Sequence, residues 1–152
     1  MEKAYGGVVI NQNGQVLLRE PSGHYDGYVW TFAKGRPEKG ESPEQTALRE
    51  VKEEAGIVAE VVGKIPGLFP GSVTQNEYFL MAPVADTKKF EDETQSIRWV
   101  TESEAKLLIC NTINPAGKSR DLKLLNAAFE MFRRESVRQK PSHNQPPNAL
   151  PG

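Results

Sequence analysis

The stretch from Ser42 to Gly56 constrains the fold of this chain more than any other, because residue type specifies its start and its end. Ser42 is a favourable N-cap, Pro43 suits the first helical position, and Gln45 completes a capping box with Ser42. Gly56 is suited to end the helix in a left-handed conformation. The sequence therefore predicts a helix over residues 42–56 with well-defined ends.

This predicted helix carries an apolar face and an acidic stripe side by side. The apolar positions suit packing against a core and are Ala47, Leu48, Val51 and Ala55. Glu50, Glu53 and Glu54 form the stripe, with a like-charge pair four residues apart and two carboxylates at the negative end of the helix dipole. Carboxylates that oppose helix stability indicate a site for a hard cation such as Mg²⁺. A solvated helix face is the alternative for these three residues alone.

The residues around the helix resemble the Nudix box. Gly35 is followed after five residues by Glu41, and seven further residues lead to the run that extends from Arg49 to Ile57. The motif spans 23 residues and fixes nine of them, and every fixed position is filled here. The wider resemblance to Nudix hydrolases covers about residues 4–134.

The resemblance implies an α+β fold, an α/β/α sandwich with a mixed β-sheet. It also implies a metal-dependent hydrolase of acid anhydrides, which cleaves a phosphoanhydride bond in a nucleoside diphosphate-linked or polyphosphate substrate. Mg²⁺ is the expected ion, with Mn²⁺ as a second possibility. Residue by residue, the family pattern assigns the metal to Glu50 and Glu54, the water-activating base to Glu53 and the orientation of a neighbouring glutamate to Arg49.

A further acid after the box often serves a second metal in this family. Glu93 lies where such an acid is expected, six residues before Trp99. Glu91 and Asp92 are rivals for this role. A solvated acidic loop is the alternative for all three residues.

Substrate contacts are expected around the start of the box. Lys34, Gly35 and Arg36 suit a polyphosphate chain, because cations contact its oxygens and a glycine admits close backbone approach. Trp30 is a candidate for stacking on a base, although an aromatic residue on a sheet more often belongs to the core. The segment from Trp30 to Gly35 is similar to family members that act on dinucleoside polyphosphates or diphosphoinositol polyphosphates.

These features favour a dinucleoside polyphosphate substrate. The alternatives are a nucleoside triphosphate hydrolase, a nucleoside diphosphate-sugar hydrolase, or a catalytically silent module that senses nucleotides. Proteins of the silent class usually lose glutamates of the box, whereas this chain keeps them all.

Composition limits the partners and the compartment. The formal net charge of −1 argues against stable nucleic-acid binding, so the expected partner is a small nucleotide or polyphosphate. No apolar run approaches the ~20 residues of a membrane span. Cys110 is the only cysteine, which excludes an intrachain disulfide and fits a cytoplasmic location. A homodimer is left open.

The remaining elements predict one domain and a tail. Residues 7–10 and 15–19 read as strands joined in a hairpin by the loop 11–14, and residues 28–33 are β-prone. Further strands are expected at 57–65, 77–83 and 97–100, and helices at 101–109 and 119–134. The Nudix-like domain is thus expected over residues 1–135. Residues 136–152 contain four prolines and predict a disordered C-terminal tail.

Overall fold

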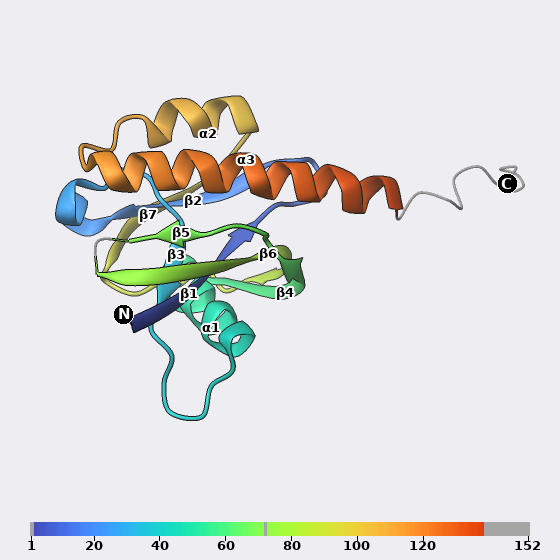
Figure 1. Ribbon diagram of the computed structural model, residues 1–152, viewed down its shortest axis with the longest axis horizontal. Coiled ribbons are helices and arrows are strands. Elements are labelled where there is room, and N and C mark those ends of the chain that lie inside the picture. The colour runs from blue at the N-terminus through green and yellow to red at the C-terminus, as the bar shows by residue number, and fades with distance from the viewer. Residues whose placement is uncertain (1, 72, 139–152) are drawn as a thin grey trace, which may run out of the picture.

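The centre of the molecule is a mixed β-sheet (Figure 1). The computed structural model describes residues 2–71 and 73–138. The sheet runs in the order β3-β1-β6-β4, and β5 also pairs with β6. Strands β1 and β6 are parallel and the other pairs are antiparallel. The strand bounds are Glu2–Val9 for β1, Ala33–Gly35 for β3, Ile57–Lys64 for β4, Phe69–Pro70 for β5 and Thr74–Asp86 for β6.

Helices cover both faces of this sheet (Figure 1). Helix α1, Pro43–Ala55, packs on one face. Helices α2, Glu102–Ile109, and α3, Pro115–Arg138, lie on the opposite side together with a two-stranded antiparallel ribbon. The ribbon consists of β2, Val16–Pro21, and β7, Thr94–Val100. This arrangement confirms the predicted α+β fold with a mixed sheet between helices.

Helix α1 forms for the reasons that its sequence indicates. The Ser42 hydroxyl accepts a hydrogen bond from the Gln45 backbone N–H at 3.1 Å, and the Gln45 side chain accepts one from the Ser42 N–H at 2.9 Å. Gly56 ends the helix with a φ of 73°. Ala47, Val51 and Ala55 are buried, as the spacing predicts.

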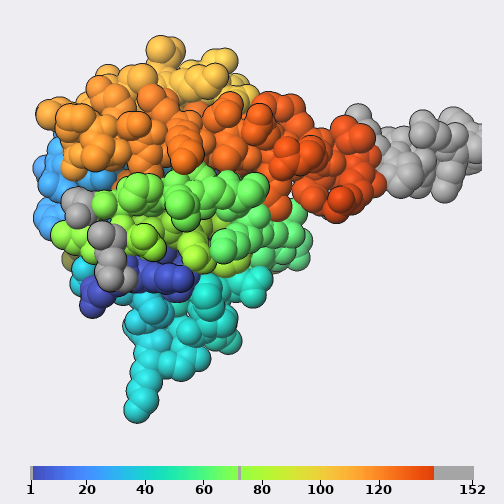
Figure 2. Space-filling model, in the orientation of Figure 1, coloured from blue at the N-terminus to red at the C-terminus, as the bar shows by residue number. Residues whose placement is uncertain are grey.

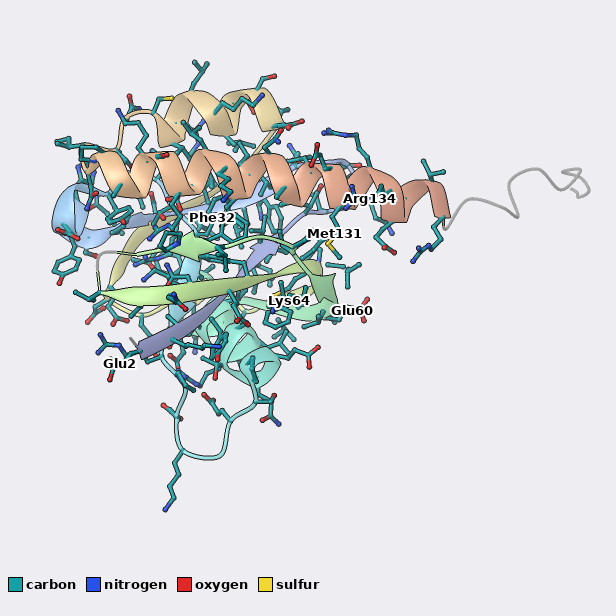
Figure 3. The ribbon with its side chains drawn as sticks, in the orientation of Figure 1. Glu2, Phe32, Glu60, Lys64, Met131 and Arg134 are labelled. Carbon is teal, nitrogen blue, oxygen red and sulfur yellow. The ribbon has the colours of Figure 1, made fainter. Side chains whose placement is uncertain are left out.

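Two apolar clusters flank the sheet. The smaller lies between the sheet and α1, and the larger lies between the sheet, α2 and α3. Phe32 is buried in the larger cluster, beneath α3 (Figure 3). Met131 of α3 reaches down to β4, where a side chain at Gly63 would collide with it (Figure 3). The sheet is thereby held rigidly between the helix that carries the carboxylates and the helix that closes the other face.

The predicted pairing of residues 7–10 with residues 15–19 is wrong, although the predicted turn at 11–14 forms. The turn forms, with the Gly14 N–H donating to the Asn11 carbonyl at 3.0 Å, but only Ile10 and Val16 are bridged across it. Six consecutive residues of β1, from Ala4 to Val9, are buried, so β1 takes a central position between β3 and β6. Strand β2 pairs with β7 instead.

The β-prone segment 28–33 was also predicted too long, because only Ala33 of this segment belongs to a strand. Trp30 and Phe32 use their aromatic side chains for core packing rather than for a ladder.

Helix α3 is longer than predicted at both ends. Pro115 suits the first turn, where its missing N–H is harmless, and the helix continues to Arg138. Residues 136–138, expected in the tail, are therefore helical. The rest of the predicted tail, 139–152, lies outside the described residues. No helix among the described residues is long and apolar enough to cross a membrane.

Candidate active site

Two carboxylates of α1 lie against the end of β3. The Glu54 carboxylate accepts a hydrogen bond from the Lys34 backbone N–H at 3.1 Å and lies 3.8 Å from the Arg19 Nε. The Glu50 carboxylate lies against Gly35, where any Cβ atom would collide with it. Glycine at position 35 leaves the room that the Glu50 carboxylate occupies. Glu50 and Glu54 therefore lie beside the same short strand, β3.

Burial makes these two carboxylates costly to ionise. It raises the pKa of Glu54 to about 7, although the Arg19 charge opposes the shift and Glu50 adds to it. Burial also raises the pKa of Glu50, against the lowering effect of Arg49. A divalent cation would relieve both effects, because it stabilises the ionised forms.

The donor set fits Mg²⁺ only in part. No three His, Cys, Asp or Glu side chains converge into a ready metal cluster within residues 2–71 and 73–138. Mg²⁺ often uses one or two carboxylates, and water and substrate phosphates complete its shell. Glu50 and Glu54 supply that number.

Arg49 joins the acidic side chains into one network. It forms two hydrogen bonds with Glu41, at 2.7 and 3.0 Å, and its Nη1 donates to Glu50 at 3.0 Å and to Glu53 at 3.1 Å. Its Nη2 also donates to the Arg36 carbonyl at 3.1 Å. The paired Arg49 guanidinium lowers the pKa of Glu41 to about 2. Arg49 therefore contacts two of the three stripe glutamates, Glu50 and Glu53. Glu41 anchors it, a role that the sequence analysis did not assign.

The loop before β7 brings further acids to α1. The Glu93 carbonyl accepts hydrogen bonds from the Arg19 guanidinium at 2.8 Å and from the Ser22 N–H at 2.9 Å. Glu93 lines the same cavity as Glu54, and its charge adds to the effect of burial that raises the pKa of both Glu50 and Glu54. Glu91 donates its backbone N–H to the Glu53 carbonyl at 2.8 Å. The structure thus brings Glu93 to the predicted site, with Glu91 close to Glu53.

A cavity of about 650 Å³ opens beside these carboxylates. Three acids line it, namely Asp26, Glu54 and Glu93, and four cations line it as well, namely Arg19, Lys34, Arg36 and Arg120. Gly35 lies on its wall. One cavity therefore combines the acidic side chains with the groups that a polyphosphate needs.

The two predicted cations differ in setting. Lys34 is half-buried; burial lowers the pKa of its amine, and the nearby Arg120 charge lowers it further. Arg36 is exposed on the loop that projects between β3 and α1 (Figure 2), and its Nε lies 3.0 Å from a Glu2 carboxylate oxygen. Glu2 lies at the start of β1 (Figure 3). The ion pair holds Arg36 at the edge of the cavity.

The structure does not bring Trp30 to the cavity. Its side chain is buried in the larger core cluster, with the Arg98 guanidinium 5.7 Å from its ring centre, and it is not among the described residues that line the cavity. Stacking on a substrate base is therefore not supported for Trp30. Two tyrosines line the cavity instead, Tyr25 in an exposed position and the half-buried Tyr28.

Part of the cavity wall comes from α3, which was predicted from its helical spacing alone. Arg120 and Asp121 are both buried there, among Leu124, Leu125 and Ala128. Two charged residues on the apolar face of a predicted helix are a signal that could have identified them, since such residues are rarely buried without a specific partner.

The comparisons with known proteins agree with this geometry. A family model described as NUDIX domain matches residues 2–120. A Bacillus subtilis (strain 168) protein named “Putative 8-oxo-dGTP diphosphatase” is 30% identical over 105 residues, which cover 67% of this chain and 68% of that protein. An RNA pyrophosphohydrolase of Acinetobacter baylyi is 42% identical over 57 residues, or 38% of this chain, and this match spans only 32% of that protein.

A solved structure shares the fold. The Ap4A hydrolase of C. elegans, crystallised as a binary complex, has a TM-score of 0.68 and 24% sequence identity, with 89% of this chain and 99% of that chain covered. The family match includes the acidic network and every described residue that lines the cavity. The chain belongs to the Nudix family of hydrolases, which act on pyrophosphate bonds and generally need divalent metal ions.

Proposed function

We propose that the protein hydrolyses a phosphoanhydride bond within the phosphate chain of a nucleotide, with a dinucleoside polyphosphate as the favoured substrate. The observation that carries this proposal is the cavity in which Glu54 and Glu93 share a wall with Arg19, Lys34, Arg36 and Arg120. Acidic groups suit a metal ion, and the cations suit the phosphate oxygens that the ion leaves uncoordinated.

Each side chain has a role in this proposal. Glu50 and Glu54 would hold the ion, Mg²⁺ or Mn²⁺, because both ions take oxygen donors, and Glu93 is the candidate for a second ion. When bound, the ion neutralises phosphate charge and lowers the pKa of water. Glu53 accepts a proton from the attacking water, and Arg49 holds Glu53 and Glu50 in place through its hydrogen bonds.

The size and lining of the cavity support a nucleotide rather than pyrophosphate alone. Ligand cavities of roughly 300–1,000 Å³ enclose molecules of nucleotide size. Tyr25 and Tyr28 add aromatic surface to the same cavity, which a base can contact.

A nucleoside triphosphate is the second candidate. It is favoured by the relative from Bacillus subtilis, whose name gives 8-oxo-dGTP as its substrate, since this relative is matched over two thirds of this chain.

A substrate panel tests the proposal. The full-length protein is assayed with Mg²⁺ or with Mn²⁺ on dinucleoside polyphosphates, nucleoside triphosphates and nucleoside diphosphate-sugars, and the products are identified by mass. Reaction in ¹⁸O-labelled water identifies the attacked phosphorus. We expect the fastest turnover on a dinucleoside polyphosphate. Equal or faster turnover of a nucleoside triphosphate would favour the second candidate, and no turnover on any member would overturn the proposed function.

A further inference from the structure

We propose that Arg120 binds a phosphate group of the substrate at the α3 side of the cavity, and so selects substrates by the length of their phosphate chain. This inference rests on the proposed function for the presence of a phosphate chain. It adds a residue of α3 that recognises the phosphate chain in the cavity that Glu54 of α1 also lines.

The Arg120 guanidinium is buried but lines the cavity. Its side chain is 3% exposed. The Nε–H donates to the Asp121 carboxylate at 3.1 Å, and the other oxygen of this carboxylate accepts the Thr31 hydroxyl at 2.6 Å. Among the described residues, no hydrogen bond joins the terminal nitrogens of Arg120 to a carboxylate. Asp121 therefore fixes the Nε edge of the guanidinium, and no carboxylate among the described residues occupies its terminal nitrogens in place of an anion.

Tyr28 fixes the plane of the same guanidinium. The guanidinium carbon of Arg120 lies 5.3 Å from the Tyr28 ring centre. The ring fits against α3 because residue 117 is glycine, and a Cβ atom there would collide with the Tyr28 hydroxyl. Stacking and a carboxylate hydrogen bond together restrict the side chain to one orientation. A fixed guanidinium loses little entropy when it binds a phosphate through two parallel hydrogen bonds.

The charges around Arg120 favour an anion rather than a neutral group. Asp121 balances Arg120, and Arg19 lies 3.8 Å from Glu54. Lys34, which lines the same cavity, makes no ion pair with any described residue. A metal ion on Glu50 and Glu54 would add further positive charge. Asp26 and Glu93 also line the cavity, so its charges are close to balanced until an ion binds. A phosphate compensates the charge that the ion adds and can contact Lys34 and Arg120, whereas an uncharged base or sugar does not.

The position of Arg120 predicts how the phosphate chain of the substrate lies in the cavity. One part of the phosphate chain lies beside the α1 carboxylates, and another part reaches Arg120 below α3. A substrate with three or more phosphates spans both positions. A nucleoside diphosphate-sugar has fewer phosphates, so it places a neutral sugar at one of these two positions.

The variant Arg120→Lys tests the inference with a matched control. Lysine keeps the charge but loses the two-nitrogen fork. Arg133→Lys is the control, because Arg133 also lies on α3, stacks on a ring at 6.0 Å and pairs with a carboxylate at 3.0 Å, but is 56% exposed and does not line the cavity. The first readout is calorimetric binding of inorganic tripolyphosphate to the metal-free proteins. The second is kcat and KM on triphosphate and diphosphate substrates with Mg²⁺.

We expect Arg120→Lys to weaken tripolyphosphate binding by about 10- to 100-fold, the usual effect of losing a charge-assisted hydrogen bond, and Arg133→Lys to bind as the wild type does. The KM should rise for the triphosphate more than for the diphosphate substrate, with a smaller change in kcat. Unchanged binding by a folded Arg120→Lys variant, or no tripolyphosphate binding by the wild type, would overturn the inference.

A second variant separates the loss of a phosphate contact from unfolding of the protein. Arg120→Met combined with Asp121→Asn removes both buried charges together, which is far less costly than leaving one unpaired. It must also lose tripolyphosphate binding for the inference to stand. Failure of the proposed function gives a different result, namely Arg120-dependent binding of tripolyphosphate without hydrolysis of any substrate in the panel.

Discussion

Helices α1 and α3 supply charge to the same cavity from opposite faces of the sheet, but they hold that charge differently. The acids of α1 form a stripe, cross-linked by one partly exposed arginine. The charges of α3 lie within the larger apolar core, where Arg120 and Asp121 pair with each other. The first arrangement can accept an ion and release it. The second is permanent, and suits recognition of a fixed part of the substrate.

The largest effect should come from the acidic side. Glu53→Gln keeps the shape of the side chain and removes its charge, so we expect kcat to fall by ~10²–10⁴-fold, the usual contribution of a general base. The melting temperature should stay near that of the wild type, because the repulsion from the neighbouring glutamates is relieved while the partly exposed ion pair with Arg49 at 3.1 Å is weakened. Glu44→Gln on the same helix is the control and should keep full activity. Near wild-type turnover by Glu53→Gln would show that Glu53 is not the general base and would leave Glu50 or Glu93 as the candidate.

The arginine that cross-links the stripe comes second. Arg49→Lys cannot make the paired hydrogen bonds to Glu41 and also reach Glu50 and Glu53. We expect kcat to fall by ~10- to 100-fold, a usual cost of misplacing metal ligands, together with weaker Mg²⁺ binding measured by calorimetry. If the variant loses activity and its Mg²⁺ affinity is unchanged, Arg49 acts on the base rather than on the metal ligands.

The third prediction concerns stability and pH in the metal-free protein. The pKa of Glu54 is raised to about 7 from an ordinary value of 4.5, so the folded state favours its protonated form. This contribution to stability is complete below pH 4.5 and is lost as the pH rises through 7; it amounts to at most about 3 kcal/mol. The melting temperature should therefore fall over this range.

Glu54→Gln should flatten that fall, and Mg²⁺ should reverse it in the wild type alone. Thermal unfolding at pH 4.5, 6 and 7.5, with EDTA or with Mg²⁺, measures both effects. An identical pH profile for wild type and variant would show that Glu54 does not control the metal-free stability.

The smallest effect should come from Arg36. Its ion pair with Glu2 is exposed, and such pairs contribute roughly 0–1 kcal/mol. We expect Arg36→Ala to raise KM for polyphosphate substrates by less than about fivefold, well below the effect of Arg120→Lys. Kinetics on substrates with two, three and four phosphates checks this. A rise in KM as large as that for Arg120→Lys would remove the distinction between the exposed and the buried cation.

The same contrast explains what the sequence could predict. The part of the site on α1 could be predicted because its signals are local. A capping box, a terminal glycine and a helical stripe lie within one stretch of chain. The positions of Glu50 and Glu54 beside Gly35 follow from that stretch and the strand before it.

The α3 half depends on contacts between distant residues. Thr31 and Asp121 meet across 90 positions of the chain, and Arg19 meets Thr94 across 75. The choice between stacking and core packing for Trp30 has the same origin, because only the packed sheet decides which aromatic side chain faces the core. The two strands joined by the turn at 11–14 diverged for that reason too, since each found a better partner far along the chain.

The pairing of β1 with β6 has a consequence for the order of folding. Parallel neighbours join Glu2 to Thr74 and Val9 to Met81, so these strands meet only after a loop of about 70 residues has closed. Helix α1 lies inside that loop and can form early, because its signals are local. Its carboxylates can therefore line up as a helical stripe before β6 completes the centre of the sheet. Contacts this distant slow folding, and a nascent chain that has not yet produced β6 holds the motif without a sheet to anchor it.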